Sequence, residues 1–205
     1  MVSDVFMQKL NSKKKKFMKK NLKPKFSINI QLDQKKYSIL KKKKDLIFEV
    51  TNSSFLVKYE KPDLKKRINY ILSLICDFST ELSIRFCDSE EMLSSNSYYR
   101  GKKYPTDVLS FPATENLPIQ SNTQYLGDIL ICLPICYNQA LKAKQTFAAE
   151  LEKMIIHGIL HLKGFDHERN KNAWIVMTQL EKNIQAVLLK EMGKPSWCKA
   201  TIQSK

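Results

Sequence analysis

Residues 157–167 read HGILHLKGFDH and contain all three histidines of the 205-residue chain. His157 and His161 are four residues apart in a stretch of helical periodicity, so their imidazoles are expected on one face of a helix, one turn apart. Gly164 can adopt a left-handed conformation, end that helix and let His167 turn back towards the same face. This spacing predicts that the three histidines bind one metal ion.

Three imidazole ligands with a fourth position open are typical of a catalytic zinc site, because structural zinc sites are normally closed by four protein ligands. We therefore expect one zinc ion per chain as the cofactor. The alternative is that these are ordinary core or surface histidines, and their concentration around a glycine argues against it.

The position after the first histidine separates this site from the zinc proteases. The spacing H-x3-H-x2-G-x2-H matches the ligand frame of the extended zinc proteases, which place a catalytic glutamate directly after the first histidine. Gly158 occupies that position. Glycine cannot accept a proton from water, so peptide hydrolysis by that mechanism lacks its general base. These proteases are the metzincins. We expect the metal site to have their ligand geometry but not their glutamate-dependent hydrolysis of peptides.

The hydrophobic pattern of the whole chain indicates an α+β fold, with a small mixed four-stranded sheet covered by about five helices. Strands are expected at residues 81–87, 108–111 and 126–132, and the two candidates for the first strand of the domain are 26–32 and 46–52. Helices are expected at residues 62–77, 89–99, 134–144, 146–162 and 172–192. The segment 126–132 is nearly all apolar, so its Asp128 is expected to be a buried, hydrogen-bonded acid.

Charge and hydropathy divide the chain into three parts. Of the net charge of +15, residues 1–45 contribute +12, from fifteen lysines and three aspartates, and the remainder contributes +3. We expect a basic, mobile arm at residues 1–25, a single catalytic domain at 26–191 whose start lies between 26 and 46, and a C-terminal tail at 192–205. The arm suits the phosphates of RNA, or it is a solvated tail that aids solubility.

The cysteines and the lengths of the apolar segments predict that the protein is located in the cytoplasm. Five cysteines, odd in number and scattered, are expected to be reduced thiols. Cys132 and Cys136 are expected to be buried structural residues, because a lone C-x3-C is a weak metal signal. No apolar run approaches the ~18 residues of a membrane span, and residues 1–8 do not resemble a secretory signal. No membrane contact is expected.

Residues 157–167 resemble the signature of the bacterial YbeY endoribonuclease family. Two further segments, YRGKKYPTDVLSFP at 99–112 and LGDILI at 126–131, resemble its other signatures and occur in the same order. Weaker similarity runs from about Leu46 to Glu191, includes Glu181 in the last expected helix, and leaves out the lysine-rich arm. The departures are small, with Phe165 and Cys132 standing where tyrosine and serine are common.

The resemblance implies a zinc-dependent enzyme that cleaves single-stranded RNA, matures the 3′ end of 16S ribosomal RNA and associates with the small ribosomal subunit. It also implies that His157, His161 and His167 hold the zinc. Arg100 is then expected to line a cleft that faces the zinc ion. The metal would activate water or polarise a phosphoryl oxygen. A guanidinium grips phosphate bidentately, so Arg100 would stabilise the charge that develops on the phosphate.

Two other functions fit parts of the pattern. A metalloprotease or other zinc hydrolase would recruit its base from elsewhere, for instance Asp128 or Asp166. A non-catalytic ribosome-assembly factor would bind RNA through lysines and use zinc only for folding.

A mixed aromatic and basic segment lies close to Arg100. Its tyrosines, Tyr98, Tyr99 and Tyr104, flank Lys102 and Lys103. Such a mixture suits the unstacked bases and the phosphates of single-stranded RNA. Core packing is expected to account for at least one of the three rings.

Overall fold

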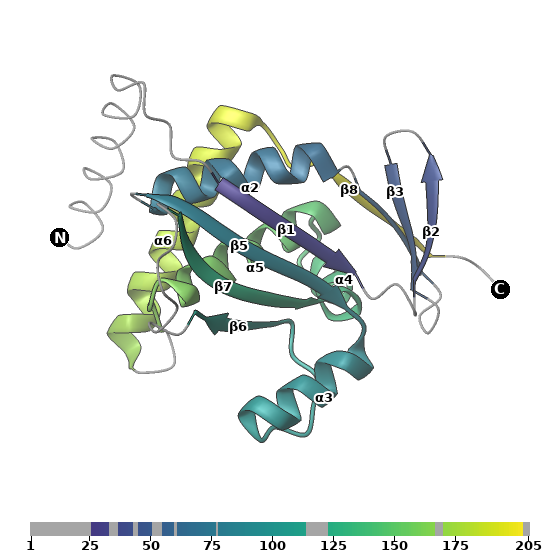
Figure 1. Cartoon of the computed structure of the whole chain (residues 1–205), viewed down its shortest axis with the longest axis horizontal. Coiled ribbons are helices and arrows are strands. Elements are labelled where there is room, and N and C mark those ends of the chain that lie inside the picture. The colour runs from purple at the N-terminus through teal and green to yellow at the C-terminus, as the bar shows by residue number, and fades with distance from the viewer. Residues whose placement is uncertain are drawn as a thin grey trace.

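The computed structural model describes most of the chain and shows an α+β architecture (Figure 1). The described residues are 26–32, 37–42, 45–50, 55–59, 61–76, 78–113, 123–166 and 170–202. They form five helices and two sheets of four strands each. The predicted arm at residues 1–25 and the predicted ligand His167 lie outside the described residues.

The central sheet is mixed and has the strand order β1-β5-β7-β6. Strands β1 (Phe26–Leu32), β5 (Ser79–Cys87) and β7 (Thr123–Cys132) run parallel, and β6 (Val108–Pro112) is antiparallel to β7. Each strand was predicted to within three residues at either end. The α+β class and the mixed four-stranded sheet predicted from the sequence are confirmed.

The two faces of this sheet belong to two cores of different size. In β7, Ile129 and Ile131 join the large core, whereas Leu130 and Cys132 join the small one. Successive residues of a strand face opposite sides of its sheet, so the two cores lie on opposite faces. The near-continuous apolar run of β7 therefore reflects burial on both faces.

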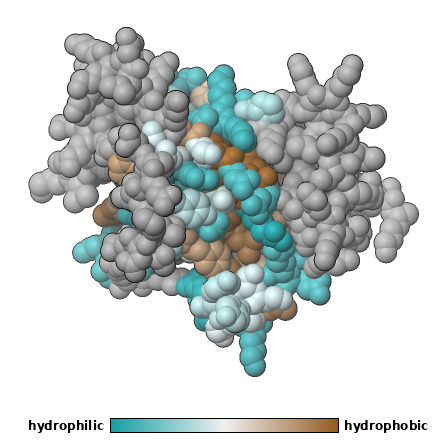
Figure 2. Space-filling model, viewed as in Figure 1, coloured by the Kyte–Doolittle hydropathy of each residue, from teal (hydrophilic) through white to brown (hydrophobic). Residues whose placement is uncertain are grey.

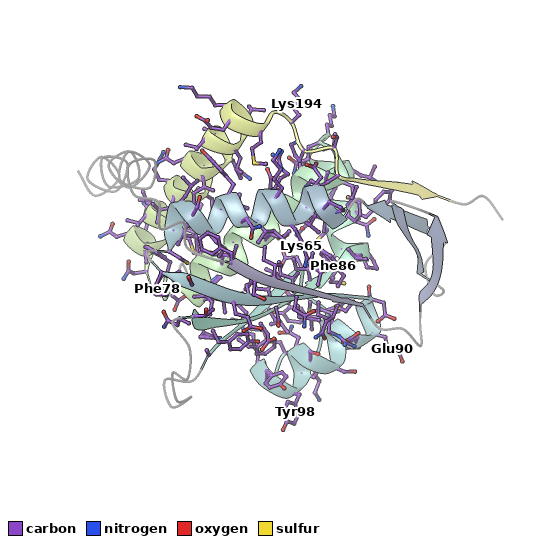
Figure 3. The ribbon with its side chains drawn as sticks, turned by 45° about the horizontal axis from the view of Figure 1, so that its top comes forward. Lys65, Phe78, Phe86, Glu90, Tyr98 and Lys194 are labelled. Carbon is purple, nitrogen blue, oxygen red and sulfur yellow. The ribbon has the colours of Figure 1, made fainter. Side chains whose placement is uncertain are left out.

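Five described helices surround the sheet, as the sequence predicted. The helices α2 (Lys61–Ile75), α5 (Phe147–Leu162) and α6 (Lys171–Met192) contribute to the large core, and α3 (Ser89–Arg100) covers the small one on the other face (Figure 3). Helix α4 (Leu133–Lys142) packs alongside α5. Side-chain caps set several of the starts.

Polar side chains cap the starts of α5 and α3. The Thr146 side chain accepts a hydrogen bond from the backbone N–H of Ala149 at the start of α5, and Asp88 accepts one from Glu91 at the start of α3. Gly193 follows the last residue of α6, at the predicted end of that helix.

A second, antiparallel sheet was only partly predicted. Its order is β2 (Tyr37–Lys42), β3 (Asp45–Val50), β4 (Phe55–Tyr59) and β8 (Cys198–Ile202). The sequence indicated a strand near β3 alone, and β8 lies within the segment expected to be a tail. Pairing of β4 with β8 joins segments that lie far apart in the sequence, so no local periodicity could reveal it. The domain bounds drawn from the sequence stay a prediction.

A buried ion pair connects α2, α5 and the end of α6. Arg67 is 3% exposed and Glu152 is 6% exposed, and Nη2 of Arg67 lies 3.2 Å from Oε1 of Glu152. The same guanidinium donates hydrogen bonds to the backbone oxygens of Met192 at 3.4 Å and Gly193 at 3.1 Å. It thereby satisfies carbonyl groups at the C-terminal end of α6, where a positive charge is stabilising. The pair holds α6 against α5.

All five cysteines lie among the described residues, where they are buried and form no disulfide bond. Cys132 and Cys136 are fully buried, as expected of structural residues. Within the described part of the chain, no helix has the length and hydropathy needed to cross a membrane.

Candidate active site

A cavity of about 540 Å³ lies where the last residue of α3, strand β6 and the end of α5 meet. Its wall is formed by Arg100, Thr106, Asp107, Val108, Leu109, Ser110, Pro112, His157, His161, Gly164, Phe165 and Asp166. Two predicted metal ligands and the predicted phosphate-binding arginine therefore face one space, although they come from distant parts of the sequence.

The two described histidines meet through their ring nitrogens. Nε2 of His157 lies 3.0 Å from Nε2 of His161, and the ring centroids are 4.6 Å apart with an interplanar angle of 70°. Two imidazole nitrogens on one tetrahedral zinc, each bonded at about 2.0–2.1 Å, would be separated by about 3.3 Å. The observed pair needs only a few tenths of an ångström of movement to share such an ion. The geometry of this pair fits a metal.

Glu181 of α6 contacts the His157 ring at Nδ1, the nitrogen that does not face His161. Oε1 of Glu181 lies 2.6 Å from Nδ1 of His157, and the two side chains are 14% and 21% exposed. A carboxylate at Nδ1 favours the tautomer that carries its proton there, which leaves Nε2 as the lone-pair donor. The sequence included Glu181 only in a region of weaker resemblance and assigned it no role, because its partner lies on another helix.

The turn after α5 ends the helix in the predicted way. Gly164 has φ = 83°, and its N–H donates to His161 O at 2.9 Å, while Phe165 N–H donates to Leu160 O at 3.1 Å. These two bonds form a Schellman motif, which the left-handed glycine permits. Among the described residues, no group of three or more His, Cys, Asp or Glu side chains is placed to hold a metal. The predicted third ligand lies outside them.

Gly158 faces the sheet. A Cβ atom at this position would lie 2.9 Å from both Cδ1 and Cγ2 of Ile129 in β7. The hydroxyl of Ser110 in β6 also donates to the Gly158 carbonyl at 3.3 Å. The close approach of α5 to the sheet thus leaves no room for a glutamate where the zinc proteases carry their base.

Arg100 is the last residue of α3 and is exposed at the wall of the cavity. The helix ends there because Gly101 adopts a left-handed conformation with φ = 67° and donates to Ser97 O at 3.1 Å. The sequence signature suggested that Arg100 faces the histidines, and the structure places it on the same cavity.

Asp107 is a wall residue to which the sequence assigned no role. Its carboxylate accepts hydrogen bonds from Gln139 of α4 at 2.9 Å, from Thr106 Oγ1 at 3.0 Å and from the Val108 N–H at 2.9 Å. Burial alone would raise the pKa of the Asp107 carboxyl, but these hydrogen bonds outweigh it and lower the pKa below its ordinary value. Asp107 therefore carries a negative charge and fixes the segment before β6.

The two acids considered as replacement bases differ in position. Asp128 was predicted to be buried, and that prediction is wrong: it is exposed and accepts a hydrogen bond from the Tyr125 hydroxyl at 2.7 Å. Its neighbours Gly127 and Ile129 are both buried, so the exposure is local to this one side chain. Asp128 is also not part of the cavity wall, whereas Asp166 is.

Comparison with known proteins gives one consistent family. Residues 49–188 match the family model described as "Endoribonuclease YbeY". A protein of that name from Xanthomonas axonopodis pv. citri is 44% identical over 110 residues, which cover 53% of this chain and 68% of that protein. One from Stenotrophomonas maltophilia strain K279a has the same identity and coverage. A solution structure from Thermotoga maritima is 26% identical and covers 66% of this chain and 87% of its own, with a TM-score of 0.42.

Proposed function

Because this chain belongs to the endoribonuclease YbeY family, we propose that it is a metal-dependent endoribonuclease that cleaves single-stranded RNA. In the cell it would mature the 3′ end of 16S ribosomal RNA and act on the small ribosomal subunit in the cytoplasm. The observation that carries the proposal is the shared cavity, in which Arg100 and the paired histidines of α5 face the same space.

Zinc is the metal that suits these donors. His157 and His161 present imidazole nitrogens, which are borderline ligands that zinc accepts in tetrahedral geometry, and His167 is the proposed third ligand. With three protein ligands, one coordination position would stay open, and we propose one zinc ion per chain. A metal bound there would supply Lewis-acid chemistry to a phosphodiester.

The protein's own side chains then have separable tasks. Arg100 binds the phosphate, because its fork of N–H donors matches two phosphate oxygens and its charge offsets the charge that develops during cleavage. Glu181 orients the His157 ring through the 2.6 Å contact at Nδ1. Asp107 holds the wall segment between α3 and β6 through its three hydrogen bonds.

The position of Gly158 argues against a protease of the metzincin type. That mechanism needs a carboxylate next to the first histidine ligand, and the contact of Gly158 with Ile129 leaves no room for a glutamate side chain there. A phosphodiester substrate, in contrast, makes direct use of the positively charged Arg100 at the cavity.

The test combines metal analysis with RNA cleavage. We expect about one zinc per wild-type chain, loss of metal and cleavage in His161→Ala, and retained metal with kcat lowered roughly 10²- to 10³-fold in Arg100→Ala. Lys142→Ala on α4 removes a positive charge away from the cavity wall and serves as the matched control. Thermal unfolding of each variant checks that the fold is retained.

Each alternative predicts a different result. Ribosomal RNA processing that persists in folded Arg100→Ala and His161→Ala would contradict the nuclease and support a non-catalytic assembly factor. Digestion of a generic protein substrate by the wild type, with RNA left intact, would support a zinc hydrolase of another class.

A further inference from the structure

Three tyrosines stand exposed at one end of the molecule, around the end of α3. Tyr98 is 82% exposed, Tyr99 is 62% exposed and Tyr104 is 54% exposed. The expectation that at least one of them packs in the core is wrong. Figure 2 shows a pale surface of intermediate hydropathy over α3, and Figure 3 shows Tyr98 projecting away from the sheet. Large rings usually gain stability by burial, so three exposed ones together call for a physical reason.

The backbone that carries these rings is firmly held. Asn96 is fully buried and donates through Nδ2 to Tyr104 O at 2.6 Å. The hydroxyl of Ser97 donates to Lys102 O at 3.2 Å, and the Lys102 N–H donates to Asn96 O at 3.3 Å. The loop after α3 is thereby tied to the last turns of the helix. The rings are presented from a fixed base, which lowers the entropic cost of binding a ligand.

The tyrosine surface is continuous with the candidate active site. Tyr99 directly precedes Arg100, and its ring packs edge-on against Phe111, with centroids 4.8 Å apart and an interplanar angle of 62°. The Phe111 ring packs against the small core, whereas its neighbours Ser110 and Pro112 point to the other face and line the cavity, so Tyr99 and the cavity meet at the edge strand β6. A chain bound with one phosphate at Arg100 would therefore extend its next groups over Tyr99.

The charge of this segment suits a polyanion. Between Glu91 and Asp107 the sequence has Arg100, Lys102 and Lys103 and no acidic residue. Exposed aromatic rings interleaved with positive charges match a chain of bases and phosphates. A duplex would offer its phosphates but keep its bases stacked inside, so the rings would gain nothing from it.

We propose that Tyr98, Tyr99 and Tyr104 form a stacking surface for the unpaired bases next to the phosphate held by Arg100. This surface gives the enzyme its preference for single-stranded RNA. The inference rests on the proposed nuclease function, but it concerns binding, which can be measured without cleavage. The RNA base nearest the cavity stacks on Tyr99. The next bases outward stack on Tyr98 and Tyr104.

The experiment measures binding of short single-stranded RNAs that contain 2-aminopurine at successive positions, a base whose fluorescence falls on stacking. We expect quenching with the wild type, and roughly five- to a hundredfold weaker binding for each ring removed in Tyr98→Ala, Tyr99→Ala and Tyr104→Ala. Tyr99→Phe keeps the ring and is expected to bind like the wild type. Leu141→Ala, which truncates a 57% exposed side chain on α4, is the control for loss of exposed apolar surface.

Salt dependence separates stacking from charge. The tyrosine variants are expected to keep the wild-type slope of log affinity against log salt, whereas Lys102→Ala and Lys103→Ala are expected to flatten it. A tyrosine variant that changed the slope would contradict stacking as the role of its ring.

Cleavage of the same RNAs is followed in parallel, so that the two proposals fail separately. Ring-dependent binding without cleavage by the wild type would overturn the nuclease function and leave the stacking surface supported. Cleavage by the wild type, with unchanged RNA binding in folded tyrosine-to-alanine variants, would overturn the stacking surface and leave the nuclease standing. Equal affinity for duplex and single-stranded RNA would also overturn it.

Discussion

His157 shows how much of a metal site depends on groups that never touch the metal. Its Nε2 faces His161, and its Nδ1 is occupied by Glu181 at 2.6 Å. An imidazole that is free to rotate or to change tautomer would lose part of its binding free energy as a ligand. Glu181 therefore acts as a positioning residue in the proposed site.

We predict that Glu181→Ala weakens zinc affinity about 10- to 100-fold. Glu181→Gln is expected to lose less, because its amide oxygen can still accept the Nδ1 proton. Competition with a chelating fluorescent indicator gives both affinities without relying on activity. Thr178→Ala, one turn earlier on α6, is the control for truncation on the same helix. Equal affinity of Glu181→Ala and wild type would remove Glu181 from the site.

The acids near the site show what single residues do not reveal in sequence. Asp128 lies in an apolar run yet is exposed, whereas Asp107 lies in a polar segment yet is largely enclosed by donors. Apolar neighbours in sequence indicate the average burial of a strand. The burial of one side chain depends on what covers it from other elements.

Helix α5 is the element that joins core and site. Its apolar residues are buried in the large core, and its two histidines face the cavity. The contact of Gly158 with Ile129 sets how close the helix lies to β7, and the histidine before it moves with that distance. The local sequence thus couples packing of the helix to placement of the ligands.

Substitution at Gly158 tests this coupling. In Gly158→Ala the new methyl group meets Ile129, at a cost of about 1–3 kcal/mol for overpacking, which the helix propensity of alanine offsets by about 1 kcal/mol. We expect a net loss of up to about 2 kcal/mol in the free energy of unfolding, measured by urea denaturation. The double variant with Ile129→Val removes one clashing atom and is expected to lose less than the sum of the single variants.

The measured stability of Gly158→Ala can also contradict the prediction. A Gly158→Ala protein more stable than the wild type would show that helix propensity dominates and that the approach of α5 to β7 is not tight.

At the scale of the whole molecule, the cavity exists only because α3, β6 and α5 meet. The buried pair of Arg67 and Glu152 connects α5 with α2 and the end of α6, and so fixes the helix that carries Glu181. The site is assembled by the large core on one face of the sheet and by α3 on the other.

Charge is also a property of the whole chain. Residues 1–25 contain nine lysines and one aspartate, and they lie outside the described residues. If this segment binds RNA phosphates, its deletion is expected to flatten the dependence of log affinity on log salt, by about 0.7 for each phosphate of single-stranded RNA that is no longer neutralised. Equilibrium binding at several salt concentrations measures the slope. An unchanged slope would leave the segment as a solvated tail.

The sequence alone determined the features that local chemistry controls. The spacing of His157 and His161, the helix end at Gly164, and the positions of the helices and of the central-sheet strands all depend on residues a few positions apart. The family followed from segments quoted directly from the chain and is confirmed by the family model. The zinc ion and the third ligand stay predictions.

Only the tertiary structure decided the features that join distant segments. It showed that Glu181 supports His157, that β8 pairs with β4, and that Asp128 is exposed. The physical reason is that hydrophobic periodicity indicates which face of an element is buried, but not which element covers it. Those partners are set by the packing of whole helices on the sheet, which no short window of sequence contains.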